Sequence, residues 1–205
     1  MENQQARLQL LFGTPLWRAK WPASLSPSLR RIADQVESDV ANGEINSSFN
    51  KSNFLGFQSR RCLLKDSPYL EACERQALLA ILKSILPLSS NFRILSWINC
   101  TPPGSHNSAH VHPGAEISGV FYISVPLESG RLVFRDPRPQ SEMSRLSTKF
   151  GAAIGALRPR FEVTPEPGEL LLFPSWLMHQ VEPGLGQHGL RISMAFNING
   201  LKRVD

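Results

Sequence analysis

From residue 91 onward, short runs of apolar and β-branched residues are separated by prolines and glycines. Runs of this kind predict β-strands, and the Pro and Gly residues between them predict turns. A succession of short strands joined by turns is typical of an antiparallel β-sandwich or barrel. The predicted strands cover residues 92–98, 117–125, 131–135, 156–163, 169–173 and 190–198.

Two helices are predicted before these strands. Ser26-Pro27 supplies an N-cap followed by proline at the first helical position, and apolar residues then recur at helical spacing until Asn42-Gly43. Ser67-Pro68 predicts a second helix in the same way, which ends before Pro87. We therefore expect one domain over 1–205, with a helical support region at 1–90 and a β-core at 91–200. The polar stretches 44–56 and 137–153 are predicted to be long loops.

Composition argues against several classes of protein. No apolar run reaches the ~18 residues that span a bilayer, and the N-terminus lacks the features of a signal peptide. The 3 cysteines form no CxxC pair, so reduced thiols in a cytoplasmic protein are expected rather than disulfides. The net charge is +5, but the basic residues are scattered, and we expect no nucleic-acid partner and no membrane association.

Three histidines suggest a metal site. His110 and His112 form an HxH pair, and the period of two in a strand would place both imidazoles on one face. His179 lies far downstream, after an apolar run, and a barrel can bring two such distant strands together. Imidazole binds iron, zinc, copper or nickel, and three ligands would leave coordination positions open for substrates. The alternative is that these are surface histidines, or core histidines with satisfied hydrogen bonds.

Arg191 lies inside a predicted apolar strand, where a guanidinium is costly unless it meets a carboxylate. Ser193 is two residues further along and would point from the same face. Together they form a plausible clamp for the far carboxylate of a dicarboxylic acid. The alternative is a structural salt bridge between Arg191 and a nearby Asp or Glu.

Seven sequence blocks together indicate a family. They are LLFGTPLW (10–17), GFQS (56–59), SWIN (96–99), HVHPGAEISGVFYISVP (110–126), GRLVFRDPR (130–138), PGELLLFPSWLMHQVEP (167–183) and RISMAFN (191–197). These blocks resemble those of the 2-oxoglutarate/iron(II) oxygenases of bacteria and marine phages, a branch of that superfamily. The resemblance spans nearly the whole chain and is most specific in the C-terminal half. It implies a double-stranded β-helix (a jelly-roll, cupin-like fold) that uses Fe(II), 2-oxoglutarate and O2.

The resemblance also implies roles for individual residues. It places metal ligands at His110 and His179 and 2-oxoglutarate binding at Arg191 with Ser193. Apart from the resemblance, Asn99 and Tyr122 lie on predicted strands and could donate to the co-substrate; the alternative is core packing, which is favoured for Tyr122. One departure is His112, because the superfamily usually has Asp or Glu at this position. Glu116 is the alternative third ligand, since Gly104, His110, His112 and Glu116 also match the spacing of a cupin motif.

The expected activity is therefore that of a 2-oxoglutarate-dependent dioxygenase (an oxidoreductase) that hydroxylates a small-molecule or peptide substrate and releases succinate and CO2. The alternatives are a cupin-type metal enzyme that does not use 2-oxoglutarate, and a non-enzymatic metal- or ligand-binding barrel. A homodimer formed through an exposed face of the N-terminal helices is a further expectation. The substrate itself is not readable from the sequence.

Overall fold

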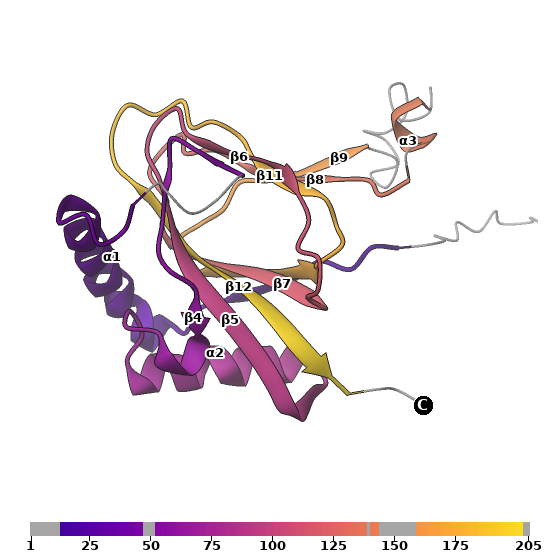
Figure 1. Ribbon diagram of the computed structural model, residues 1–205, viewed down its shortest axis with the longest axis horizontal. Coiled ribbons are helices and arrows are strands. Elements are labelled where there is room, and N and C mark those ends of the chain that lie inside the picture. The colour runs from indigo at the N-terminus through magenta and orange to yellow at the C-terminus, as the bar shows by residue number, and fades with distance from the viewer. Residues whose placement is uncertain (1–12, 47–51, 139, 144–158, 203–205) are drawn as a thin grey trace, which may run out of the picture.

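Two antiparallel sheets face each other in the computed structural model, which describes residues 13–46, 52–138, 140–143 and 159–202 (Figure 1). The larger sheet has the strand order β1-β10-β7-β12-β5-β3, and β4 also pairs with β5. Its strands are β1 (Trp17–Lys20), β3 (Phe57–Gln58), β4 (Cys62–Leu63), β5 (Leu88–Thr101), β7 (Ile117–Ser124), β10 (Glu169–Pro174) and β12 (Arg191–Leu201).

The smaller sheet has the order β2-β6-β11-β8-β9. Its strands are β2 (Asn53–Phe54), β6 (His106–His110), β8 (Leu132–Arg135), β9 (Arg160–Val163) and β11 (His179–Val181). From β5 to β12 the chain passes repeatedly between the two sheets, which gives a jelly-roll of the double-stranded β-helix type. The predicted fold class, mainly β with N-terminal helices, is confirmed.

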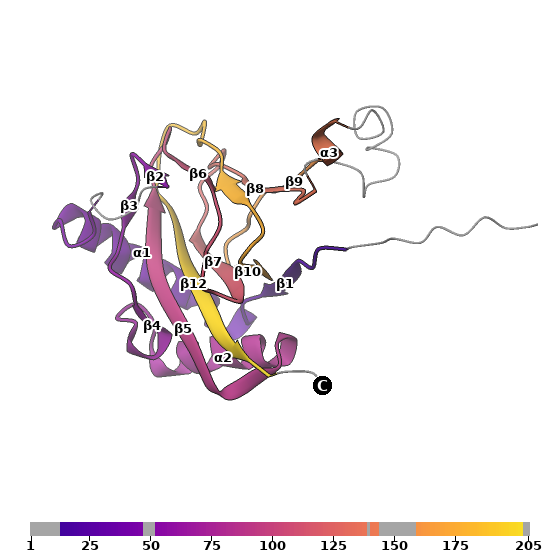
Figure 2. The ribbon, with the colours of Figure 1, turned by 45° about the vertical axis from the view of Figure 1, so that its right-hand side comes forward.

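Two helices, α1 (Ser26–Ala41) and α2 (Ala72–Ile85), lie against the outer face of the larger sheet (Figures 1 and 2). Ile32 and Val36 of α1 and Leu78 and Leu82 of α2 are fully buried there. They share one apolar core with outward-facing residues of the sheet such as Ile98. A second, smaller core between the two sheets contains Leu132, Phe134, Val163, Leu171 and Phe173. The helices therefore cover one face of the larger sheet, and the opposite face is available for a functional site.

The predicted start of the second helix is wrong. Ser67 has an extended backbone, as expected of a residue before proline, and follows the short 3-10 helix η2 (Leu64–Asp66). The helix begins instead at Ala72, because Glu71 and Glu74 form a capping box in which the Glu71 amide donates to Glu74 Oε2 at 2.7 Å. The first helix begins at Ser26, one residue before the predicted start at Pro27, so Leu25 of η1 (Ala23–Leu25) and not Ser26 is its N-cap; the proline lies in the first turn as predicted.

Residues before position 91 contribute strands as well as helices, which corrects the expectation of a purely helical support region. β1 pairs with β10 of the larger sheet, and β2 pairs with β6 of the smaller sheet. These strands are 4 and 2 residues long, too short for a period of two to be visible in the sequence. In the predicted loop 137–153, residues 140–143 form the short helix α3 (Gln140–Met143), and residues 144–153 lie outside the described part of the chain. Residues 156–158 of the predicted strand 156–163 also lie outside it.

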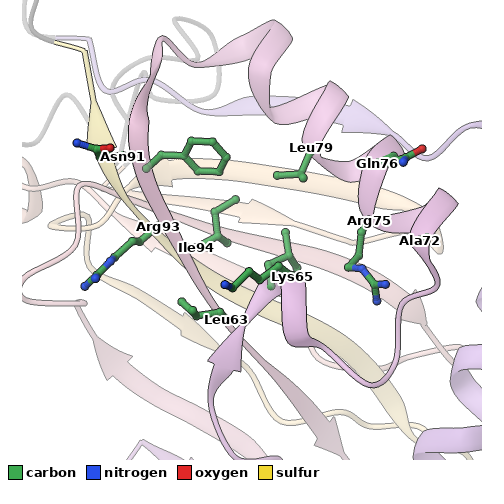
Figure 3. A pocket seen from close by; sticks show the side chains of 11 residues that line it. Leu63, Lys65, Ala72, Arg75, Gln76, Leu79, Asn91, Arg93 and Ile94 are labelled. Atoms are coloured by element: carbon green, nitrogen blue, oxygen red, sulfur yellow. The ribbon is translucent and has the colours of Figure 1, made fainter.

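A groove of about 900 Å³ lies on the outside of the molecule between α2, η2 and β5 (Figure 3). Leu79 of α2 and Ile94 of β5 contribute apolar surface to it, and Lys65, Arg75 and Arg93 contribute cations. It shares no lining residue with the cavity described below. Among the described residues, the helices are too short or too polar for any of them to cross a membrane.

Candidate metal centre

His110, His112 and His179 come together between the two sheets. One ring nitrogen from each lies within 4.8 Å of the others. His110 ends β6 and His179 begins β11, and the two are direct partners in the antiparallel ladder between these strands. Their ring centroids are 4.4 Å apart, while His112 lies 5.0 Å from His110 and 5.1 Å from His179. The structure thus brings together three residues that are up to 69 positions apart in the sequence.

The expected placement of His112 on a strand beside His110 is wrong. β6 ends at His110, and Gly114 has a φ of 82°, which favours glycine and turns the chain after Pro113. His112 is instead fixed by its backbone, because its amide donates to the Ser175 carbonyl at 3.0 Å and its carbonyl accepts from the Ala115 amide. A turn, rather than the period of two in a strand, therefore places the imidazole of His112 beside those of His110 and His179.

Backbone carbonyls fix the orientation of two of the imidazoles. His110 Nδ1 lies 2.7 Å from the Ser108 carbonyl, and His179 Nδ1 lies 2.9 Å from the Leu177 carbonyl. Because a carbonyl only accepts, each Nδ1 carries the proton and each Nε2 keeps a free lone pair. This is the arrangement in which histidines commonly bind a metal through Nε2.

Burial keeps the three imidazoles neutral in the metal-free protein. Burial lowers the pKa of His179 from 6.5 to about 3, and the nearby His110 adds to the effect. Burial likewise lowers the pKa of His112 to about 4, with further contributions from His110 and Arg61, and it lowers the pKa of His110. Neutral imidazole is the form that binds a metal, so the cluster needs no deprotonation near pH 7. Three neutral nitrogen donors fit a divalent transition metal such as Fe(II).

Arg191 opens into the same cavity as the histidines. It begins β12 and is only 3% exposed, and no carboxylate pairs with it among the described residues. Its Nη2 donates to the Tyr122 hydroxyl at 3.4 Å, but its buried Nε has no hydrogen-bond partner in the described part of the chain. The structural salt bridge considered as the alternative is therefore not present there. A buried guanidinium with a free donor is a site for an anion.

The other predicted co-substrate residues lie in one row across the inner face of the larger sheet. Asn99 of β5 is the ladder partner of Ser193 of β12, and Ser193 is the ladder partner of Tyr122 of β7. All three line the cavity with Arg191. Burial raises the pKa of Tyr122, so its phenol stays protonated and able to donate. The structure thus brings together every residue expected at the site.

Glu116, the alternative third ligand, is not part of the histidine group. Its Oε2 accepts from the backbone amides of Gly200 at 2.7 Å and Leu201 at 2.9 Å. These bonds tie the segment before β7 to the end of β12. Glu116, the acidic residue of the spacing that matched a cupin motif, therefore has a structural role in this chain.

Trp97 and Asn107 are among the cavity residues that were not singled out from the sequence. Trp97 of β5 has its ring centroid 5.8 Å from that of His112, and the guanidinium of Arg61 lies 4.7 Å from the Trp97 ring. Asn107 of β6 also lines the cavity. The predicted strand 92–98 contained Trp97, but a tryptophan in a strand is ordinarily a core residue, so no signal marked it as part of a site.

The fold and the site together define a double-stranded β-helix in which three histidines that could hold a metal ion share a cavity with a buried arginine. A family model with the description "Putative 2OG-Fe(II) oxygenase" matches residues 95–197, about half of the chain. The chain therefore belongs to the 2-oxoglutarate/Fe(II)-dependent oxygenases, a family of enzymes whose cofactors are Fe(II) and 2-oxoglutarate. The matched segment runs from β5 to β12 and includes all three histidines and Arg191.

Solved structures of similar fold include several oxygenases. A prolyl-4-hydroxylase from Pseudomonas putida is 18% identical, with a TM-score of 0.59 over 91% of this chain and 93% of that one. A prolyl hydroxylase from Trichoplax adhaerens is 11% identical, with a TM-score of 0.61 over 89% and 82%. HygX from Streptomyces hygroscopicus is 14% identical, with a TM-score of 0.58 over 91% and 83%. At these identities the likenesses establish the fold; no curated protein sequence matches the chain.

Proposed function

We propose that this oxygenase hydroxylates a small-molecule or peptide substrate, with His110, His112 and His179 as its iron ligands. The support is the proximity of three neutral imidazoles, two of them oriented by backbone carbonyls. Iron bound there, with 2-oxoglutarate and O2, supplies the oxidising power to insert oxygen into a C–H bond while 2-oxoglutarate is converted to succinate and CO2. A triad of histidines leaves the iron site one unit more positive than the usual triad with a carboxylate, which favours an anionic co-substrate.

The residues of the larger sheet would hold 2-oxoglutarate. Arg191 would grip its far carboxylate with two donors, and Tyr122 and Ser193 would add hydroxyl donors from the neighbouring positions. Asn99 would contact the co-substrate from the next strand. The apolar side chains of Leu132 and Phe173, which line the same cavity, would exclude water from the reacting groups.

The observation that carries this proposal is Arg191, buried beside the histidines without a carboxylate partner in the described residues. A barrel that binds metal alone does not need a free guanidinium at this place, and a cupin-type metal enzyme that does not use 2-oxoglutarate would need one only for an anionic substrate. A dicarboxylate such as 2-oxoglutarate would use both features, with its far carboxylate at Arg191 and its 2-oxo acid end toward the metal that the histidines would hold.

The test is an anaerobic titration of the Fe(II)-loaded protein with 2-oxoglutarate. We expect a visible charge-transfer absorption band in the wild type and a much weaker affinity in Arg191→Ala, with the same iron content. In air, Arg191→Ala should form no succinate. A wild-type protein that binds iron but gives no band on addition of 2-oxoglutarate would favour the cupin-type alternative, and unchanged turnover in Arg191→Ala would refute the role of this residue.

The substrate class is best approached by a screen for substrate-stimulated succinate release. The Trichoplax enzyme was solved with a peptide fragment of a hypoxia inducible factor, and HygX with nickel and 2-oxoglutarate. Peptides and small metabolites are therefore the first compounds to test. The three free thiols support our further proposal of a cytoplasmic location, and the expected homodimer stays a prediction.

A further inference from the structure

A fourth polar side chain extends the row that crosses the inner face of the larger sheet. Gln58 of β3 is the ladder partner of Asn99, which continues the row to Ser193 and Tyr122. Gln58 is only 4% exposed, and it does not line the cavity itself. Ladder partners project from the same face of a sheet, so Gln58 reaches the cavity only through Asn99.

The contact between these two amides determines what Asn99 presents to the cavity. Gln58 Nε2 donates to Asn99 Oδ1 at 2.9 Å. An asparagine amide has one oxygen that accepts and one NH2 group that donates, and the two ends are nearly the same shape. Because Gln58 occupies the oxygen, the NH2 group is the end left for a ligand.

β3 is held in place by contacts other than the Gln58 side chain, and the Gln58 backbone itself donates to the Asn46 carbonyl at 3.1 Å. The neighbouring Ser59 already anchors this segment to β5, because its amide donates to the Ile98 carbonyl at 3.0 Å and its hydroxyl accepts from the Ile98 amide at 2.9 Å. Phe57 also pairs with Cys100 in the ladder. A buried glutamine side chain that adds little to this anchoring has its clearest use in the orientation of Asn99.

We infer that Gln58 is a positioning residue, which orients the Asn99 amide so that its NH2 group donates to an oxygen of 2-oxoglutarate. The inference rests on the proposed function. With the opposite orientation, Asn99 would direct a carbonyl oxygen at an anionic ligand, and the contact would become repulsive. Nothing else about the cavity needs to change for this reversal, since the two orientations fill the same space.

The experiment is calorimetric titration of 2-oxoglutarate into the Ni(II)-loaded protein, which avoids turnover. Gln58→Leu removes the donor, and we expect affinity to fall about three- to tenfold, the range of one net hydrogen bond. Gln58→Glu offers an acceptor, so Asn99 turns its NH2 group away from the cavity, and we expect a larger loss at about pH 8. On acidification to about pH 6 the loss relative to wild type should shrink, because a buried carboxyl with a raised pKa becomes protonated and donates again.

Matched controls separate this role from a structural one. Gln76→Leu and Gln76→Glu make the same changes at an exposed position of α2 and should leave affinity unchanged. Thermal unfolding of each variant reports stability, and in turnover with iron the KM for 2-oxoglutarate should rise while kcat stays near wild type. Unfolding of Gln58→Glu at both pH values separates the two roles, because charge-induced loosening of the packing would lower the melting temperature at about pH 8, whereas reorientation of Asn99 lowers affinity without that loss.

If wild type and Arg191→Ala differ in affinity but both Gln58 variants bind as wild type does, the inference is overturned while the proposed function stands. If the wild type itself does not bind 2-oxoglutarate, the proposed function fails. Should the Gln58 variants not fold, Asn99→Asp tests the same point. In this variant Gln58 would donate to one oxygen of the new carboxylate, and the other oxygen would place negative charge in the cavity. We therefore expect the affinity for 2-oxoglutarate to fall at least about tenfold. Affinity equal to wild type would overturn the inference.

Discussion

His112 occupies the position at which a carboxylate completes the usual facial triad of two histidines and one acid. Its backbone is held by Ser175 and Ala115, and its ring is in contact with Trp97, so the imidazole is supported independently of any metal. Glu116 is engaged with Gly200 and Leu201 and is not directed at the histidines. At the scale of single residues, these contacts support our proposal of a site with three nitrogen ligands.

Substitutions of His112 test this assignment. We expect His112→Ala to weaken Fe(II) binding at least about tenfold, since a ligand is lost, and His112→Asp to retain binding, because it restores the common triad. Metal content after dialysis against a weak chelator measures both. Glu116→Ala is the control, and a loss of metal in that variant would return Glu116 to the ligand set.

The histidines also predict a pH dependence for the metal-free protein. The pKa of His179 is lowered to about 3 and that of His112 to about 4, from an ordinary value of 6.5 that applies to the unfolded chain. Below about pH 6.5 the unfolded chain therefore binds more protons than the folded one, and stability falls as pH falls toward 4. Urea unfolding in the presence of a chelator should show this loss, and His179→Gln should reduce it. Equal slopes in both proteins would contradict the explanation.

At the scale of the elements, the packing of β7 against β12 depends on Gly119. A Cβ atom at this position would clash with the buried Phe196 ring and lie 2.7 Å from Leu172 Cδ2. We expect Gly119→Ala to lower the free energy of unfolding by about 1–3 kcal/mol, the usual cost of overpacking a core. Denaturant unfolding measures it, with Gly13→Ala as a control because nothing lies within 4 Å of a Cβ there. Wild-type stability in Gly119→Ala would show that the ring moves aside freely.

The long strands and the first helix could be predicted from the sequence because their signals are local. β7, β10 and β12 begin and end within three residues of the predicted runs, and α1 begins one residue before the predicted Pro27. β2, β3 and β4 have 2 residues each and carry no period, so they escaped prediction. They exist because the edges of the two sheets offer free backbone groups with which a passing segment can pair.

For the site, too, the features with a local sequence signal could be predicted, and those that depend on contacts between distant segments could not. Arg191 and the histidines were predictable because each residue type is unusual in its setting and the family motifs include them. The turn that carries His112, and the pairing of Gln58 with Asn99, depend on contacts between segments that are far apart in sequence. Residue spacing alone contains no information on such contacts.

At the scale of the whole molecule, the β-core and the region before it are one structure. Ile98, Phe121, Leu172 and Met194 face the helices and belong to the same apolar core as α1 and α2. A fragment of residues 91–205 would expose this face and would also lose the strands that pair with β5, β6 and β10.

We therefore expect the fragment 91–205 to aggregate or to bind a hydrophobic dye, and not to take up metal. Size-exclusion chromatography and circular dichroism, compared with the full chain, would measure this. A monomeric fragment with native spectra and bound iron would show that the β-core folds by itself and that the helices are an addition to it.

The place of β12 has a consequence for how the protein is made. It comes after every other described strand in the sequence, yet it lies in the middle of the larger sheet, between β7 and β5. While a ribosome is still synthesising the chain, β5 and β7 lack the partner that joins them, and the residues that would hold 2-oxoglutarate on β12 do not yet exist. Cooperative closure of the sheet must wait until this strand has emerged, so nascent chains need protection from aggregation until then, and the complete site can form only once β12 has paired with β5 and β7.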